Sequence, residues 1–209
     1  MKKYLVFLIP FIINCAGAGG SFQTPTVSNG SLPSSSPTPT LCSCNSVSNT
    51  DSNPEAITHF TSGTLRNDYT GYVGGVFYLA HHNLIVTSLG RMMFSGNSGT
   101  HTLAIYSAAT GLIVPGSIVL VNMSGATSGQ YVYVKLSSGV VLFEDNTYFV
   151  VSNEIVSGDK WSDANDNVSI TSSFVNVSRG YGNGDLHSWI NAGNIGTMYG
   201  PVNIKYQLQ

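Results

Sequence analysis

The stretch Tyr131-Val132-Tyr133-Val134-Lys135-Leu136 indicates the fold class of this chain. Its side chains alternate, so that valine and leucine share one face of an extended backbone while tyrosine and lysine share the other. Alternation with a period of two is typical of a β-strand with one buried face. Val, Ile, Thr and Tyr are also the residues that strands prefer. The stretch therefore predicts a strand that lies on a hydrophobic core.

Similar apolar runs recur from Ile57 to the end of the sequence, separated by turns such as Ser95-Gly96-Asn97-Ser98-Gly99. No window carries a helical stripe with a period of 3.6 residues. Strands are expected near Gly74–Ala80, Leu84–Phe94, Thr102–Tyr106, Ile118–Asn122, Tyr131–Leu136, Tyr148–Ile155, Val168–Asn176 and Val202–Gln207. About eight short strands separated by turn signals predict an all-β fold, an antiparallel β-sandwich or jelly roll over residues 55–209.

The first residues have the pattern of an export signal. Lys2 and Lys3 form a short basic region, and Tyr4 to Ile13 is an apolar run that only Pro10 interrupts. Ten helical residues rise about 15 Å, half the thickness of a bilayer core. We therefore interpret residues 1–18 as a signal peptide and not as a membrane-spanning helix.

Two processing sites compete at the end of this signal. Ile12-Ile13-Asn14-Cys15 resembles a bacterial lipoprotein signal, in which the cysteine thiol receives a lipid, although Asn14 stands where such signals usually have a small residue. The alternative is cleavage after Ala18 in the small-residue pattern Ala16-Gly17-Ala18. Lipidation of Cys15 is the favoured interpretation and predicts an outer-membrane or cell-surface lipoprotein with a membrane anchor. Cleavage after Ala18 predicts a freely secreted protein.

Residues 19–54 are dominated by Ser, Thr, Pro, Asn and Gly and contain almost no aliphatic residues. Such a composition cannot bury enough apolar surface to offset its ordering entropy. The segment is expected to be a disordered tether between the signal and the sandwich.

Composition excludes one class of partner. Only 9% of the residues are charged, and 8 Lys and Arg against 10 Asp and Glu give a net charge of -2. Nucleic-acid binding needs clustered basic residues, so no nucleic-acid partner is expected. All three cysteines (Cys15, Cys42 and Cys44) precede the predicted fold, so disulfides are not expected in the core.

Several turn-rich stretches resemble a β-sandwich accessory domain of unknown function found in secreted bacterial proteins. They are Thr64-Leu65-Arg66-Asn67-Asp68-Tyr69-Thr70-Gly71 followed by Val73-Gly74, Ser88-Leu89-Gly90-Arg91, Gly96-Asn97-Ser98-Gly99-Thr100-His101, and the set Glu154, Gly158, Asp159, Trp161 and Asp163. The resemblance spans residues 63–207. It implies a jelly roll similar to galactose-binding domains, and it assigns no activity.

One loop carries residues that suit a calcium ion. Asp159, Asp163, Asn165, Asp166 and Asn167 place five oxygen-bearing side chains within nine positions. Ca²⁺ takes six to eight oxygen ligands, so the loop is a candidate structural calcium site. In the alternative interpretation these side chains bond their own backbone in turns. No other cofactor is expected.

The candidate ligand-binding residues are aromatic. Trp161, Tyr181, His187, Trp189 and Tyr199 lie in or near the Gly-rich segment 179–200, which reads as a long loop. Exposed planar rings can stack on sugars. In the other interpretation both tryptophans cap the ends of the sandwich core; it is the favoured one for Trp161, and neither is favoured for Trp189.

No enzyme signature is present. A Gly-x-Ser-x-Gly motif is absent. His81, His82 and His101 are interpreted as exposed loop residues, and Glu154 and Asp159 as holding a turn together rather than as a glycosidase pair. The sequence therefore predicts a non-catalytic exported protein that binds glycan or an extracellular protein. The alternatives are a self-assembling structural protein and, less favoured, a glycan-active enzyme.

Overall fold

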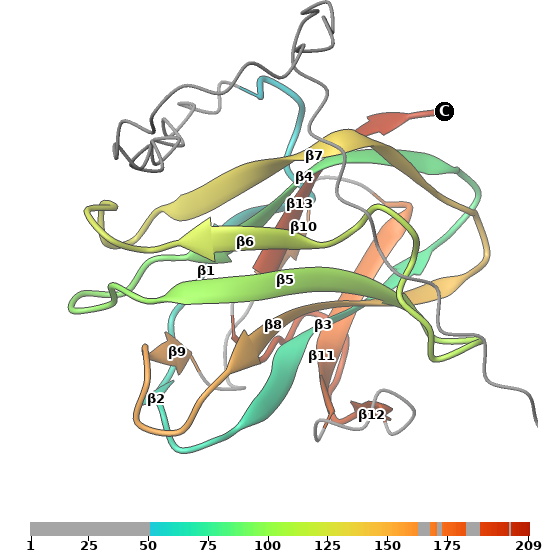
Figure 1. The fold of residues 1–209 in the computed structure, drawn as a ribbon. Helices are drawn as coiled ribbons and strands as arrows, with labels where there is room; N and C mark the ends of the chain where they lie inside the picture. The colour runs from blue at the N-terminus through green and yellow to red at the C-terminus, as the bar shows by residue number, and fades with distance from the viewer. Residues whose placement is uncertain (1–50, 163–167, 171–172, 183–188, 201) are drawn as a thin grey trace, which may run out of the picture. The chain divides into compact units, whose positions relative to one another are not determined.

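Strands account for every regular element in the part of the chain that the structure describes. The computed structural model describes residues 51–162, 168–170, 173–182, 189–200 and 202–209. All of them belong to one compact unit, Ser46–Gln209. The strands pair antiparallel throughout and stack in two layers (Figure 1). The expectation of an all-β antiparallel sandwich is confirmed.

The first layer is a six-stranded sheet with the order β12-β11-β3-β8-β5-β6. Its strands are β3 (Gly71–Leu79), β5 (Thr100–Ser107), β6 (Val119–Asn122), β8 (Thr147–Glu154), β11 (Val175–Gly182) and β12 (Trp189–Asn191). Neighbours in this sheet are mostly distant in sequence, so its formation depends on long-range pairing.

The second layer is built on a three-stranded sheet, β13-β4-β7, formed by Val202–Leu208, Leu84–Met92 and Tyr131–Leu142. Strand β1 (Ile57–Phe60), which pairs with β10 (Val168–Ile170), joins its edge. The buried Asn203 side chain makes this link, since its Nδ2 donates to the Ile57 carbonyl at 2.8 Å and its Oδ1 accepts from the Ile57 N–H at 3.0 Å. A short pair, β2 (Leu65–Arg66) with β9 (Trp161–Ser162), lies outside both layers.

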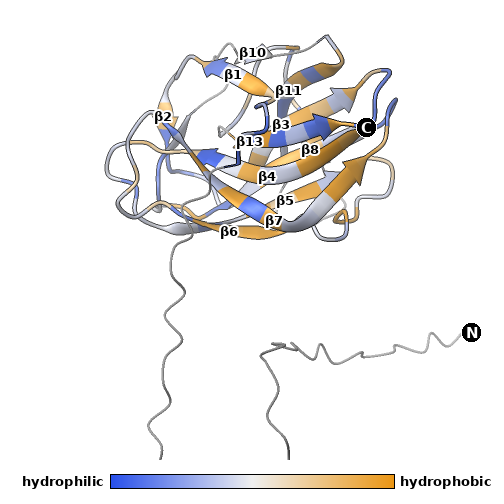
Figure 2. Cartoon of the chain, turned by 90° about the horizontal axis from the view of Figure 1, so that it is seen from above, coloured by the Kyte–Doolittle hydropathy of each residue, from blue (hydrophilic) through white to orange (hydrophobic). Residues whose placement is uncertain are grey.

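The core lies between the layers because each strand turns alternate side chains inward. In β3, Phe77 and Leu79 are fully buried on the inner face, where they meet Leu84 and Val86 of β4. In Figure 2, β7 changes between hydrophobic and hydrophilic along its length, as the alternation predicts. This periodicity is what made the strands recognisable from the sequence.

The structure corrects the expectation around residues 168–182. A single strand was expected over Val168–Asn176, but Ser173 and Phe174 form a turn, and β11 runs on from Val175 to Gly182. Part of the expected long loop is therefore sheet. Gly180 fits there because a Cβ at that position would lie 2.6 Å from the Val76 side chain. Glycine in this strand allows close packing of the neighbouring side chain. The loop was expected because glycine-rich composition is also typical of loops.

Residues just before the expected start of the sandwich bind to its second layer. The Asp51 carboxylate accepts hydrogen bonds from Thr87 Oγ1 at 2.7 Å and Ser88 Oγ at 2.5 Å. Lys205 Nζ donates to the Asp51 carbonyl at 2.6 Å, and the Tyr206 N–H donates to the Pro54 carbonyl at 3.1 Å. Residues 51–54 thus make polar contacts with the sandwich, although the sandwich was expected to begin at residue 55.

Candidate functional site

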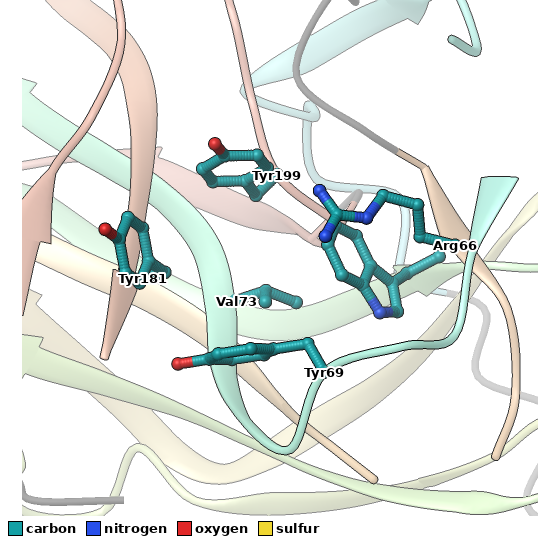
Figure 3. A pocket seen from close by; sticks show the side chains of 6 residues that line it. Arg66, Tyr69, Val73, Tyr181 and Tyr199 are labelled. Atoms are coloured by element: carbon teal, nitrogen blue, oxygen red, sulfur yellow. The ribbon is translucent and has the colours of Figure 1, made fainter. Parts of the chain in front are cut away.

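A pocket walled mainly by aromatic rings lies beside the short β2-β9 pair (Figure 3). Its volume is about 120 Å³. We call it the aromatic pocket, and it is lined by Arg66, Tyr69, Val73, Trp161, Tyr181 and Tyr199. The six side chains come from distant parts of the sequence, so only the folded sandwich assembles them.

Strand pairing places four of these side chains. Arg66 and Trp161 are directly opposite each other in the β2-β9 pair, and the Arg66 guanidinium carbon lies 5.2 Å from the centre of the Trp161 ring. Val73 of β3 is opposite Tyr181 of β11. Directly paired residues point to the same face of a sheet, so Val73 and Tyr181 form adjoining walls.

The loop that carries Tyr199 is fixed by its neighbour Gly200. The Gly200 N–H donates to the Ser162 carbonyl at 3.0 Å, which ties the loop to β9. Gly200 has a φ of +47°, and a Cβ there would lie 2.7 Å from the Val73 side chain. A residue with a side chain would therefore push Tyr199 away from the pocket.

The rings brace one another edge to face, an arrangement that aromatic pairs favour. Tyr199 lies 6.0 Å from Trp161 and 5.8 Å from Tyr181 between ring centres, with interplanar angles of 87° and 79°. Tyr69 is 6.3 Å from Tyr181, and its hydroxyl donates to the Gly182 carbonyl at 3.0 Å. Because each ring contacts another, the walls are formed before any ligand arrives.

Arg66, the charged residue that lines the aromatic pocket, is paired with a neighbouring carboxylate. Arg66 Nε and Nη2 donate to the two carboxylate oxygens of Asp68 at 2.9 and 3.2 Å. These hydrogen bonds hold the pKa of Asp68 below its usual value. Burial raises the pKa of Tyr69, with a further contribution from the nearby Tyr181, so its hydroxyl stays protonated. The Arg66 charge is therefore balanced at the rim, while a second cation, the Arg179 guanidinium, lies 5.6 Å from the centre of the Tyr199 ring.

Three of the aromatic residues expected to bind a ligand meet in this pocket. Tyr181 and Tyr199 are partly exposed, while Trp161 is only 3% exposed and forms a wall. His187 lies outside the described residues. Sequence reasoning missed Arg66, Tyr69 and Val73 as pocket residues, although all three belong to the stretch that carries the family resemblance.

Trp189 lies on the opposite face of the six-stranded sheet from Tyr181. It pairs with Gly182, the residue after Tyr181, and adjacent residues of a strand point to opposite faces. Its ring stacks on Phe149 at 4.9 Å and contacts Tyr106 at 4.7 Å. It partly covers a small second cluster, here called the outer cluster, formed by Tyr72, Val76, Ala104, Tyr106, Ile113, Phe149 and Val151. The sequence hypothesis put Trp189 beside Tyr181 or Tyr199, and the sheet separates them.

Of the candidate calcium ligands, the structure describes only Asp159. Its Oδ1 accepts from the Ser98 N–H at 3.0 Å, and its Oδ2 accepts from the Gly99 N–H at 2.8 Å and lies 3.0 Å from His101 Nε2. Burial opposes ionisation, but these hydrogen bonds leave the pKa of Asp159 below its usual value. Asp163, Asn165, Asp166 and Asn167 lie outside the described residues, and the described ones form no cluster of acidic, His or Cys side chains for a metal. Calcium binding stays a prediction.

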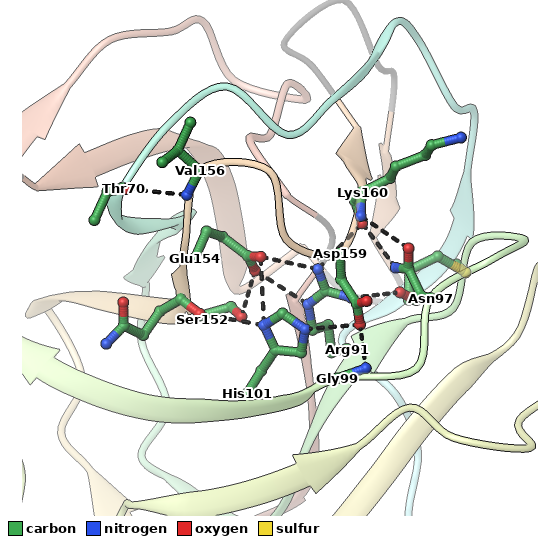
Figure 4. A network of polar contacts seen from close by, with 12 residues as sticks. Thr70, Arg91, Asn97, Gly99, His101, Ser152, Glu154, Val156, Asp159 and Lys160 are labelled. Atoms are coloured by element: carbon green, nitrogen blue, oxygen red, sulfur yellow. Dashed lines mark hydrogen bonds and ion pairs between the residues drawn. The ribbon is translucent and has the colours of Figure 1, made fainter.

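Asp159 is part of a buried polar network that ties three strands and two turns together (Figure 4). Arg91 Nε and Nη2 donate to the Glu154 carboxylate at 3.1 and 3.0 Å, and both side chains are about 1% exposed. His101 Nδ1 lies 3.3 Å from Glu154 Oε2, so its ring stands between the two carboxylates. Sequence reasoning expected an exposed His101; the inward-facing side of β5 buries it instead.

The buried polar network also fixes the turn 155–160 against the turn 95–99. Asn97 Nδ2 donates to the Lys160 carbonyl at 2.8 Å, and the Lys160 N–H donates to Asn97 Oδ1 at the same distance. Arg91, Asn97, His101, Glu154 and Asp159 all belong to the stretches that carry the family resemblance. These five side chains together hold the two turns to the sandwich.

Comparison with protein-family models, with curated proteins and with solved structures finds no match for this chain. None of the described residues forms a helix that is long and apolar enough to cross a membrane. The class of protein is thus defined by its own geometry: a β-sandwich with a preformed aromatic pocket beside the β2-β9 pair.

Proposed function

We propose that this chain is a non-catalytic, exported binding protein whose aromatic pocket takes a sugar unit of a glycan. The observation that carries the proposal is the convergence of four aromatic rings with one arginine around a single cavity. Ligand sites combine apolar and aromatic walls with a few placed polar groups, and the aromatic pocket has this composition. The C–H face of a sugar ring would lie against the rings, and its hydroxyls would reach Arg66 and Asp68 at the rim.

The volume of the pocket favours a single unit. Sites for drug-sized ligands measure about 300–1,000 Å³, whereas this one measures about 120 Å³. A terminal sugar, or one unit that projects from a chain, is the ligand that fits. Because the Asp68 carboxylate balances the Arg66 charge, the ligand proposed is an uncharged sugar.

The non-catalytic part of the proposal has support in the buried polar network. Glu154 and Asp159 are the carboxylates that sequence reasoning weighed as a glycosidase pair. Glu154 is bound to Arg91, and Asp159 to two backbone N–H groups and His101. Their side chains are 1% and 10% exposed, so a substrate would not reach them without opening the turns.

Tyr199→Ala is expected to lower the affinity of the full chain for its sugar by at least about tenfold, because tenfold corresponds to 1.4 kcal/mol and central aromatic contacts often exceed this. Ligands are first found on a glycan array, and affinities are then measured by titration calorimetry. Tyr78→Ala is the control, since Tyr78 is 39% exposed on the outer face of β3.

If Tyr199→Ala and Tyr78→Ala lose the same amount of sugar affinity, the sugar does not bind in the aromatic pocket. An array without sugar hits, together with oligomers that form as the protein concentration rises, would favour the alternative of a self-assembling surface protein. The residues to test in that case are Ile118, which directly precedes the edge strand β6, and Leu120 within it; they are 52% and 64% exposed.

We also propose that the protein is anchored to a membrane through lipid on Cys15. The cysteine stands two residues after the end of the apolar run of the export signal, with Asn14 between them. Several acyl chains on one residue would anchor the protein stably, since each buried CH₂ contributes about 0.8 kcal/mol. Cys15→Ala should move the protein from the detergent phase to the aqueous phase of a detergent partition. A variant that still partitions into detergent would overturn lipidation.

A further inference from the structure

A groove of about 1,110 Å³, much larger than the aromatic pocket, lies on the second layer of the sandwich. Its walls come from β1, from the segment between β6 and β7, and from the first residues of β7, while Lys205 of β13 also lines it. No residue of the aromatic pocket contributes to it. The two cavities are therefore separate sites.

The walls of the groove are held by backbone hydrogen bonds. The Gly129 N–H donates to the Met93 carbonyl at 2.8 Å, and the Met93 N–H donates to the Gln130 carbonyl at 2.9 Å. On the other side, the Asn203 side chain fixes the backbone of Ile57 at the start of β1. The groove is thus framed by backbone whose position the sandwich determines.

Two tyrosines supply an aromatic surface to the groove. Tyr131 and Tyr133 are two residues apart in β7 and so point to the same face, with ring centres 5.8 Å apart and an interplanar angle of 35°. Tyr133 fits closely because Gly90, which is opposite it in β4, has no side chain: a Cβ there would lie 2.5 Å from the Tyr133 ring. Because Lys205 Nζ lies over the Tyr133 ring, Tyr131 is the ring whose face a ligand could contact.

The charges that line the groove balance one another. Lys205 Nζ lies 3.9 Å from Glu55 Oε1, 4.7 Å from the centre of the Tyr133 ring, and donates to the Asp51 carbonyl. With the ammonium group so engaged, the lining offers no excess positive charge for a phosphate or a nucleic acid. The exposed polar side chains that remain, such as Thr58, Thr127 and Gln130, are hydrogen-bonding groups without charge.

We propose that this groove is a second binding site, which takes several consecutive units of a neutral polysaccharide chain. Its volume exceeds the about 300–1,000 Å³ of a site for a drug-sized ligand, so it has room for more than one sugar ring. The Tyr131 ring would lie against a sugar face, and the uncharged side chains would form hydrogen bonds with the sugar hydroxyls. The proposal does not depend on the aromatic pocket and stands if that pocket binds nothing.

The test is affinity electrophoresis of the full chain in gels that contain soluble neutral glucans, xylans or mannans. At least one polysaccharide should retard the protein, and Thr127→Trp, which places a large side chain in the groove from an exposed position, should weaken retardation by tenfold or more. Tyr131→Ala should weaken it as well. Ser128→Trp, at the next residue and outside the lining, is the matched control and should bind like the unmodified protein.

The Tyr199→Ala variant separates this proposal from the aromatic pocket. This variant should keep full retardation in the same gels. Its affinity for purified oligosaccharides of one to six units should rise with their length, whereas the affinity of Thr127→Trp, in which the groove is blocked, should not. Absence of retardation in every polysaccharide, normal retardation of Thr127→Trp, or loss of retardation in Tyr199→Ala alone would overturn the groove as a polysaccharide site.

Discussion

Glu154→Ala is expected to destabilise the sandwich by about 3–5 kcal/mol, the cost of breaking a buried ion pair from one side. The substitution leaves the Arg91 guanidinium, which is 1% exposed, without the carboxylate that accepts two of its hydrogen bonds. It also removes one of the partners of His101, and the acceptor of Ser152 Oγ, which donates to Glu154 at 2.6 Å. The melting temperature should fall by roughly 6–20 °C, since 1 kcal/mol corresponds to about 2–4 °C in a domain of this size.

Two further variants show whether an unpaired charge causes the loss. Glu144→Ala removes an exposed glutamate and should stay within about 0.5 kcal/mol of the unmodified protein. Adding Arg91→Met to Glu154→Ala should restore stability, because replacing both members of a buried ion pair is often neutral. If Glu154→Ala has the same melting temperature as the Glu144→Ala control, the buried polar network does not hold the turns as we infer.

Trp189→Ala is expected to cost about 3 kcal/mol, the lower end of the range for removing a large aromatic side chain from a packed site. Trp189 is partly exposed, but its ring stacks on Phe149 and contacts Tyr106 and Tyr72. Its removal would open the outer cluster to water. Urea denaturation measures the loss of stability. In the native protein, iodide should quench the tryptophan fluorescence only in part.

Ile190→Ala is the control for Trp189, because Ile190 is the next residue in β12 and is 45% exposed. Its effect should be well below that of Trp189→Ala. If Trp189→Ala keeps the stability of the unmodified protein and loses only glycan binding, Trp189 is a contact residue, as the sequence hypothesis had it.

Most strands could be predicted because each carries its own evidence. The alternation of Val132, Val134 and Leu136 with tyrosine and lysine places β7 from local sequence alone. The short strands could not be found in this way. β2 is two residues long and forms only because Arg66 meets Trp161 from far along the chain, so no local pattern marks it.

The sequence predicted that the candidate site is aromatic, but it identified only some of the residues that form it. Tyr181 and Tyr199 were selected as aromatic residues of the Gly-rich segment 179–200, and Trp161 as an aromatic residue before it. The three do meet in one pocket. Arg66 and Tyr69 come from another part of the chain, and nothing in the sequence indicates that they approach Tyr181. A cavity depends on which segments pair, and strand pairing is long-range.

By itself, the sequence determined that this is an all-β protein, because side-chain alternation is a local property that a strand keeps in any sheet. Only the tertiary structure decided which aromatic residues act together. Tyr181 and Trp189 are close in sequence, yet the register of β11 with β12 sends one to the aromatic pocket and the other to the outer cluster. A shift of one residue in strand register exchanges the two faces of a sheet, and the register is set by contacts across the whole sandwich.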